Sequence, residues 1–265
     1  MIRPVNAEQR AERAAANEGR PTLEFSRGTP YDDYVGTEVL HGLQNTVTGL
    51  PEERAFLVTT QVMELYFGLL CAEWTLAQEQ LDAGDAAAAV ITLRRSSRHV
   101  EALNAAWASL SWLTPRQFNA FRDALGEASG FQSAKYRQVE FLLGEKSEAM
   151  LRPHRRSPAY PELLAAFEGP SLYDSAAALL EREGFTGPQA WVAIHAADRP
   201  DLHELAEALL DLATGFADWR HRHVMSVRRS MGAKPGSGGS NGLRFLEENL
   251  RREIFPALWQ ARTHL

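Results

Sequence analysis

The sequence predicts an all-α fold, and three observations support this prediction. Apolar residues recur at steps of three and four over long segments, which is the pattern of an amphipathic helix. Proline and acidic residues stand together where such segments begin, as they do at helix N-termini. No segment shows the apolar–polar alternation of a half-buried strand, and no strand–helix–strand unit is visible. The expected architecture is a helical bundle.

Residues 1–24 are predicted to form a flexible arm, because they contain too few large apolar side chains to hold themselves against a core. Residues 25–265 are predicted to form a single domain. Its first element should be a short amphipathic helix, introduced by Tyr31 and Tyr34 and beginning its apolar pattern at Val35.

Two long helices should follow this element. The first begins at Pro51 and runs to about Gly84, and its apolar residues cover more than one face, so it should be buried among other helices. Asp85 is a candidate N-cap for the second helix, which is expected from about Ala86 to Trp112.

A third helix is expected to begin at Thr114-Pro115, and a fourth should run from Gln132 to Leu143. Prolines and turn signals are denser at about 151–200, which predicts an insertion of short helices. A strong helical pattern then runs from about Asp201 to Met231. A glycine-rich loop and one closing helix complete the expected domain.

Composition argues against several classes of function. The net charge is −6 and the pI is about 5.8, which opposes binding to phosphate backbones, so nucleic acid is not an expected partner. Cys71 is the only cysteine, so neither an internal disulfide nor a cysteine-based metal cluster can form. No uninterrupted run reaches the roughly 18 apolar residues that span a bilayer, so no membrane association is expected. We therefore expect a cytoplasmic protein.

The sequence contains eight histidines, which are candidate metal ligands. Of the eight, no pair has the spacing of two ligands on one helix face. His221 and His223 are separated by ~200° around a helix, so only one of them can face a core. His223 belongs to an apolar stripe at helical spacing, which is completed by Phe216, Trp219 and Val227. It is therefore predicted to face inward, either as a hydrogen-bonded core histidine or as a ligand.

Two further features could bind a ligand. The loop at 233–242 is rich in glycine and could present backbone N–H groups to an anion, although no strand precedes it and it could simply be a flexible turn. Arg122 could bind a substrate carboxylate through two parallel hydrogen bonds, or it could form an ion pair with Asp123 or Glu127.

Several segments, taken together and in this order, resemble the tryptophan 2,3-dioxygenase family. The resemblance extends from about Tyr31 to the C-terminus and is carried by YDDYVGTEVLHGLQ, FLVTTQVMELYFGLL, LTPRQFNAFRDALGEASGFQSAKYRQVEFLLG, PSLYD and WRHRHVMSVRRSMGAKPGSGGSNGLRFLEENLRREIFPALW. It implies an all-helical enzyme that contains haem b and is usually a homotetramer. Such an enzyme uses O2 to open the indole ring of L-tryptophan, giving N-formylkynurenine.

The resemblance also implies roles for individual residues. His223 matches the axial ligand of the haem iron, and Arg122 matches the residue that holds the substrate carboxylate. Phe56 and Phe118 match positions that contact the substrate ring.

Three loop and terminal features also match the family. Ser129 and Gly130 match a turn beside the distal face of the haem, and Ser237 matches a loop hydroxyl near the substrate ammonium, where the family usually has threonine. A further segment matches one that reaches into a neighbouring subunit's site, namely Tyr31, Tyr34 and Val35.

Thr60 is the main departure from the family pattern. It stands, within TTQVMELY, where the family has a distal histidine in a pattern resembling HQ-x-x-ELW. Thr60 lies one helical turn from Phe56, so both should face the same pocket. Threonine has a hydroxyl but cannot act as a base near neutral pH, so it leaves the reaction and substrate open. The alternative is mono- or dioxygenation of a substituted tryptophan or another aromatic amino acid in specialised metabolism.

Two other classes of function compete with an oxygenase. The chain could be a haem-binding sensor or an inactive homologue that serves as an interaction module. It could also be a helical protein without haem. Arg122 argues against a gas sensor, because a diatomic ligand has no carboxylate to bind.

Overall fold

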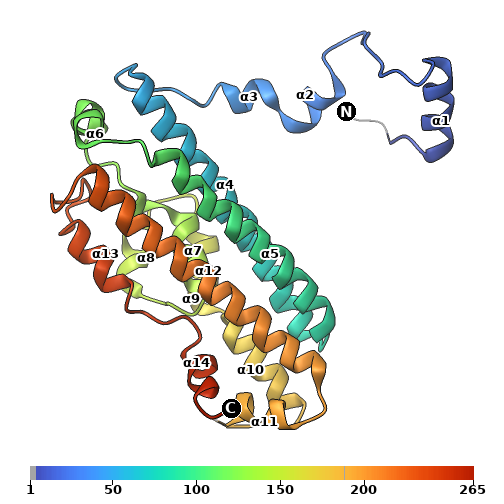
Figure 1. Ribbon diagram of the computed structural model, residues 1–265, viewed down its shortest axis with the longest axis vertical. Coiled ribbons are helices and arrows are strands. Elements are labelled where there is room, and N and C mark those ends of the chain that lie inside the picture. The colour runs from blue at the N-terminus through green and yellow to red at the C-terminus, as the bar shows by residue number, and fades with distance from the viewer. Residues whose placement is uncertain (1–3, 188) are drawn as a thin grey trace. The chain divides into compact units, whose positions relative to one another are not determined.

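The computed structural model describes residues 4–187 and 189–265 (Figure 1). It divides into two compact units, Met1–Thr46 and Val47–Leu265, each of which is described by itself. Helices make up the regular structure of both units, and no strand occurs in the described residues. The predicted all-α fold is confirmed.

The N-terminal unit contains three short helices. Within the predicted arm lies α1 (Ala7–Ala16), which begins with a capping box between Asn6 and Gln9 and buries no residue. The next two helices, α2 (Pro30–Val35) and α3 (Thr37–His41), are also without buried residues. Gly36 separates them in a left-handed conformation, with φ of 67°.

Three long helices form the centre of the second unit: α4 (Pro51–Asp82), α5 (Ala86–Ala106) and α12 (Pro200–Ser230). Helix α5 packs against both of the others, and Figure 1 shows the three lying side by side. Asp85 accepts a hydrogen bond from the Ala88 backbone N–H and caps α5, as predicted.

The packing of α5 on α12 depends on a glycine. A Cβ built on Gly215 of α12 would lie 2.8 Å from Val100 Cγ1, which is closer than carbon atoms pack. Asn104 of α5 donates a hydrogen bond to the Gly215 carbonyl at 2.9 Å. The missing side chain at Gly215 therefore lets the two helices approach closely.

The core is an apolar cluster drawn mainly from these long helices. Trp74 of α4 is fully buried and donates its indole N–H to Ser96 of α5 at 3.0 Å. That hydrogen bond satisfies a polar group that would otherwise be unpaired in the core.

The shorter elements between the long helices are α6 (Pro115–Arg122), α7 (Ala134–Leu142), α8 (Glu148–Leu151), α9 (Tyr160–Glu168), α10 (Leu172–Arg182) and α11 (Ala190–Ala196), with 3₁₀ turns η1 (Trp107–Leu110), η2 (Asp123–Leu125), η3 (Gly130–Gln132) and η4 (Arg152–His154). Helices α7 and α9 pack together around Phe141 and Leu163. Helix α10 packs on α4, and α11 packs on α12. Residues of both α10 and α11 belong to the main core, so part of the segment at 151–200 completes the bundle.

The prediction of a single closing helix is wrong. The structure has two helices there, α13 (Leu243–Asn249) and α14 (Pro256–Arg262). Proline disfavours helical backbone in the residue before it, and Phe255 takes a left-handed conformation with φ of 56°. The chain therefore turns before α14 begins.

Helix α4 is long and apolar enough to cross a membrane by length and composition, with a mean hydropathy of 1.5 over its best 18-residue window. Glutamates such as Glu64 interrupt the apolar run, so no uninterrupted span was expected here, but they do not make the window average polar. Helix α4 packs on α5, α7 and α10. A core helix has the same composition, so this finding is weak evidence for a membrane span.

Candidate functional site

His223 faces the interior of the bundle from α12, as its apolar stripe predicts. Trp219 and Phe216, one and two turns before it, are buried, whereas His221 is exposed. The His223 ring is itself half-buried.

Two tryptophans enclose the imidazole of His223. The Trp107 ring of η1 stacks on it, with ring centroids 4.9 Å apart and planes 17° apart. The Trp219 ring lies at 5.4 Å and is tilted. Stacking engages the face of the imidazole and leaves its in-plane ring nitrogens for other interactions. No hydrogen bond to either nitrogen is found within 4–187 and 189–265.

The surroundings of His223 keep it neutral. Burial lowers its pKa to about 4, and the positive charge of Arg137 adds to this effect. A neutral imidazole has a nitrogen lone pair, which is the form that ligates a metal. His223 is therefore able to act as a metal ligand at neutral pH.

Arg137 belongs to a group of buried charges that the sequence analysis missed. It forms an ion pair with Glu140 at 2.5 Å, and its guanidinium lies 4.6 Å from the centroid of the Tyr136 ring. Arg220 of α12 pairs with Glu145 and lies 3.6 Å from Glu140. The available signal was the opposite charges of Arg137 and Glu140 three residues apart on α7, but their burial depends on how α7 packs.

Phe56, Phe118 and Phe121 form an aromatic cluster between α4 and α6. Their ring centroids lie 5.4–5.8 Å apart, and Met231 at the end of α12 packs against them. The cluster therefore brings Phe56 and Phe118, both expected to contact a substrate ring, into one apolar surface. Phe118 is nearly buried, at 9% exposed, whereas Phe56 is only partly buried.

Thr60 lies one turn after Phe56 on α4 and is half-buried. Its hydroxyl donates a hydrogen bond to the Phe56 carbonyl at 2.9 Å. The proton of Thr60 is thus used within the helix, while its oxygen keeps acceptor capacity. The hydroxyl can accept a hydrogen bond from a ligand without losing the bond it already makes.

Arg122, at the end of α6, binds the glycine-rich loop. Its guanidinium donates to the Pro235 carbonyl, and no ion pair with Asp123 or Glu127 is found in the described ranges. Beside it, Lys234 donates to Asn119 at 3.1 Å. Of the two alternatives for Arg122, the ion pair with a neighbouring acid is therefore not formed in the described residues, and the substrate-carboxylate contact stays a prediction. The loop, which is far away in sequence, supplies the acceptor instead.

The same loop packs against the turn that contains Ser129 and Gly130 and is hydrogen-bonded to the residue before it. Ser237 donates its hydroxyl proton to the Ala128 carbonyl at 2.8 Å. A Cβ on Gly238 would come within 2.9 Å of Ser129 Cβ, so glycine is needed for the loop to lie this close to the turn. Ser129 also caps η3, which begins at Gly130.

A cavity of about 380 Å³ lies between this loop, the turn and α13. Its lining includes Ser129, Phe131, Gly238, Asn241 and Phe245. Helix α12 packs on both α6 and α13, and Figure 1 shows its C-terminal end beside them. His223 is not part of the cavity lining, although it is carried by the same end of α12.

The remaining predicted site residues lie in the N-terminal unit. Tyr31 and Tyr34 of α2 are 66% and 79% exposed, and Val35 is 38% exposed. These side chains are free to meet a surface outside their own unit.

Comparison with known proteins identifies the family of the chain. The family model for tryptophan 2,3-dioxygenase matches residues 15–191 and 191–265. The tryptophan 2,3-dioxygenase of Polaromonas sp. (strain JS666 / ATCC BAA-500) is 37% identical, covering 92% of this chain and 90% of the relative. The enzyme of that name from Bradyrhizobium diazoefficiens is also 37% identical, covering 94% and 97%. That from Bordetella pertussis is 36% identical, covering 95% and 96%. The chain belongs to the tryptophan 2,3-dioxygenase family.

Proposed function

We propose that this protein is a haem-dependent dioxygenase that cleaves the C2–C3 bond of the L-tryptophan indole ring to give N-formylkynurenine. The observation that carries the proposal is the neutral His223, whose ring is held between Trp107 and Trp219. The aromatic cluster and Arg122 lie at the same end of the bundle. The curated relatives match nearly the whole chain and are named tryptophan 2,3-dioxygenases, which supports this activity.

The residues present fit a haem group. His223 supplies a neutral imidazole with no competing hydrogen bond in the described parts of the chain, which suits axial ligation. The cavity beside Ser129 and Gly238 has aromatic walls at Phe131 and Phe245, and Ser129 belongs to the turn that matches the distal side of the haem in the family. When bound, haem supplies the activation of O2.

The chain itself would bind and orient the amino acid. Arg122 has five N–H donors and uses one of them on Pro235, so others are available for a carboxylate. Phe56 offers a partly buried ring for contact with the indole. Ser237 lies on the loop that Arg122 holds, where its oxygen can accept a hydrogen bond from the substrate ammonium.

Thr60 would position the indole rather than remove its proton. Its oxygen can accept a hydrogen bond from the indole N–H while its hydroxyl continues to donate to the Phe56 carbonyl. Because a threonine hydroxyl cannot serve as a base near neutral pH, the proposed reaction requires no proton transfer to this residue.

The test is to incubate the reduced, haem-loaded protein with L-tryptophan and O2 and to follow the absorbance of N-formylkynurenine. We expect this product from the wild-type protein, together with a Soret band that His223→Ala loses. Absence of a Soret band after reconstitution would overturn the haem assignment. A normal Soret band with no N-formylkynurenine at saturating tryptophan would instead favour a substituted tryptophan or mono-oxygenation, the outcome that Thr60 leaves open.

We also propose a homotetramer in which the segment with Tyr31, Tyr34 and Val35 completes the site of a neighbouring subunit. The exposed aromatic rings of α2 support this, as does the exposed apolar face of α4, which includes Leu65 at 63% and Leu69 at 39%. Exposed apolar surface on helices is typical of subunit interfaces.

Subunit complementation tests the exchange. At a tryptophan concentration near the wild-type KM, an Arg122→Ala chain and a Tyr31→Ala/Tyr34→Ala chain should each have little activity alone. When they are co-expressed, some sites combine an intact bundle with an intact segment from the neighbour, so activity should return. If each segment served its own chain, the mixture would stay inactive.

A further inference from the structure

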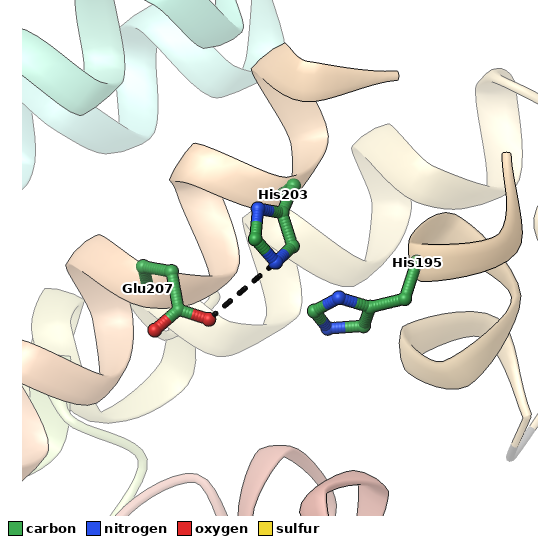
Figure 2. Close-up of side chains that lie close together, drawn as sticks. All are labelled: His195, His203 and Glu207. Atoms are coloured by element: carbon green, nitrogen blue, oxygen red, sulfur yellow. Dashed lines mark ion pairs between the residues drawn. The ribbon is translucent and has the colours of Figure 1, made fainter. Parts of the chain in front are cut away.

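A second set of ligating side chains lies at the opposite end of α12 from His223. His203 and Glu207 are one turn apart on α12, and His195 of α11 lies beside them (Figure 2). Twenty residues separate His203 from His223, which is about 30 Å along a helix. This cluster is therefore distinct from the proposed haem site.

The geometry brings one ligand atom from each residue together. These three atoms all lie within 4.8 Å of one another, and His203 Nε2 is 3.8 Å from Glu207 Oε1. The rings of His195 and His203 have centroids 4.3 Å apart and are nearly perpendicular, at 83°. Ligands of a tetrahedral Zn²⁺ are about 3.3 Å apart, given Zn–N and Zn–O distances near 2.0–2.2 Å. Small side-chain rotations would close the remaining difference.

The backbone that carries the three residues is held in place without a metal. Between α11 and α12, Arg199 pairs with Asp201 at 2.9 Å and with Glu183, the C-cap residue of α10, at 2.7 Å. Helix α11 also packs on both α12 and α14. The approach of His195 to His203 is therefore a property of the folded turn.

The charges around the cluster suit a cation only in part. The Glu207 carboxylate supplies the negative charge of the cluster. Arg262 of α14 donates hydrogen bonds to both carboxylate oxygens of Glu207. A metal on Glu207 would therefore replace one of these hydrogen bonds and keep the other, and the positive charge of Arg262 opposes a cation.

We propose that His195, His203 and Glu207 bind a divalent first-row transition metal, with Zn²⁺ as the representative ion. Two imidazoles and one carboxylate are a donor set of this class, whereas Mg²⁺ and Ca²⁺ prefer oxygen ligands. The side chains of His203 and Glu207 are 44% and 37% exposed, so a metal can enter from solvent and keep a water ligand. Bound metal links α11 to α12 and stabilises this end of the bundle.

Titration calorimetry on the untagged, haem-loaded protein tests the proposal. We expect one Zn²⁺ per chain and no heat from Mg²⁺. His195→Gln, His203→Gln and Glu207→Gln should each weaken Zn²⁺ binding at least tenfold. The matched control is His221→Gln, which removes an exposed histidine from the same helix and should leave binding unchanged. Circular dichroism verifies that each variant is folded.

Two further measurements sharpen the test. Arg262→Gln should tighten Zn²⁺ binding severalfold, because it removes the opposing charge without removing a ligand. Zn²⁺ at a hundredfold excess over its Kd should raise the Tm by about 5 °C, reversed by chelator. Equal Zn²⁺ affinity in the wild-type and His195→Gln/His203→Gln proteins, or no binding at 100-fold molar excess of Zn²⁺, would overturn the proposal.

The outcome is independent of the proposed oxygenase activity. His223→Ala should lose the Soret band and still bind one Zn²⁺ at the cluster. Loss of Zn²⁺ binding in this variant alone would show that the ion occupies the haem-ligand histidine and would also overturn the proposal.

Discussion

The ring of Trp107 stacks on the imidazole of His223, with centroids 4.9 Å apart. Trp107 begins the 3₁₀ turn after α5, and His223 lies near the end of α12, so the pair joins the two helices whose close approach depends on Gly215. The stack holds the plane of the imidazole and so determines the direction in which its nitrogens point.

Replacing Trp107 by leucine should therefore weaken haem binding. An aromatic pair contributes about 0.5–1.5 kcal/mol beyond its buried area, so the dissociation constant for haem should rise about two- to tenfold. Soret titration measures this change. Trp112→Leu is the control, since Trp112 is a nearby tryptophan that is 37% exposed. Equal haem affinity in the two variants would refute a role for the stack.

Removing the guanidinium of Arg122 should impair substrate binding. Charge-assisted hydrogen bonds contribute about 1.5–3 kcal/mol, so Arg122→Ala should raise the KM for tryptophan about 10- to 100-fold. Arg122→Lys should recover only part of this loss, because an ammonium cannot bind a carboxylate through a planar fork. Arg116→Ala removes an exposed arginine from the same helix and should have the KM of the wild-type protein. A normal KM for Arg122→Ala would exclude the carboxylate contact.

The hydroxyl of Thr60 can be tested with an isosteric change. Thr60→Val keeps the shape of the side chain and removes one neutral hydrogen bond, so kcat/KM should fall about three- to tenfold. Thr60→Ser keeps the hydroxyl and should retain most of the activity. The matched control is Thr59→Val, because Thr59 donates the same kind of hydrogen bond to the Ala55 carbonyl at 2.9 Å. If Thr59→Val and Thr60→Val lowered kcat/KM equally, the loss would come from the missing hydrogen bond within the helix and not from a contact between Thr60 and the substrate.

The low pKa of His223 predicts how stability depends on pH in the haem-free protein. Folding lowers the pKa from 6.5 to about 4, so between these values the unfolded chain binds more protons. Stability is therefore full above pH 6.5 and falls as the pH decreases toward 4. From pH 7.5 to 5 this one group should remove at most about 2 kcal/mol from the free energy of unfolding.

Urea unfolding of the wild-type protein and His223→Gln at both pH values isolates this contribution, since the other histidines are common to both. The variant should lose less stability on acidification. An equal loss in the two proteins would show that His223 does not titrate in this way.

Gly215→Ala should destabilise the bundle even though alanine favours helix. Alanine would gain up to about 1 kcal/mol of helix propensity, but its Cβ would meet Val100 Cγ1 at 2.8 Å, and overpacking costs about 1–3 kcal/mol. We expect a net loss of about 1–2 kcal/mol, measured by urea unfolding. Val100→Ala in the same chain removes the clashing methyl groups, so the double variant should lose less than the sum of the single changes.

Local sequence signals predicted most of the helices because they act within a few residues. Asp85 caps α5 through the backbone of Ala88, and Thr114 caps α6 through that of Gln117. The stripe through Phe216, Trp219 and His223 depended only on the helical period, so the inward face of α12 was predictable from sequence. Where one helix was expected at the C-terminus, the proline at 256 was the local signal for the break.

The sequence by itself determined the all-α class, the inward face of His223 and, through its family motifs, the residues of the candidate haem and substrate sites. Only the tertiary structure decided that Trp107 stacks on His223, that Pro235 rather than a neighbouring acid accepts from Arg122, and that His195 meets His203. These pairs join residues on different elements. Such contacts arise from the packing of whole helices, where Gly215 sets how closely two axes approach, and no periodicity within one segment encodes that distance.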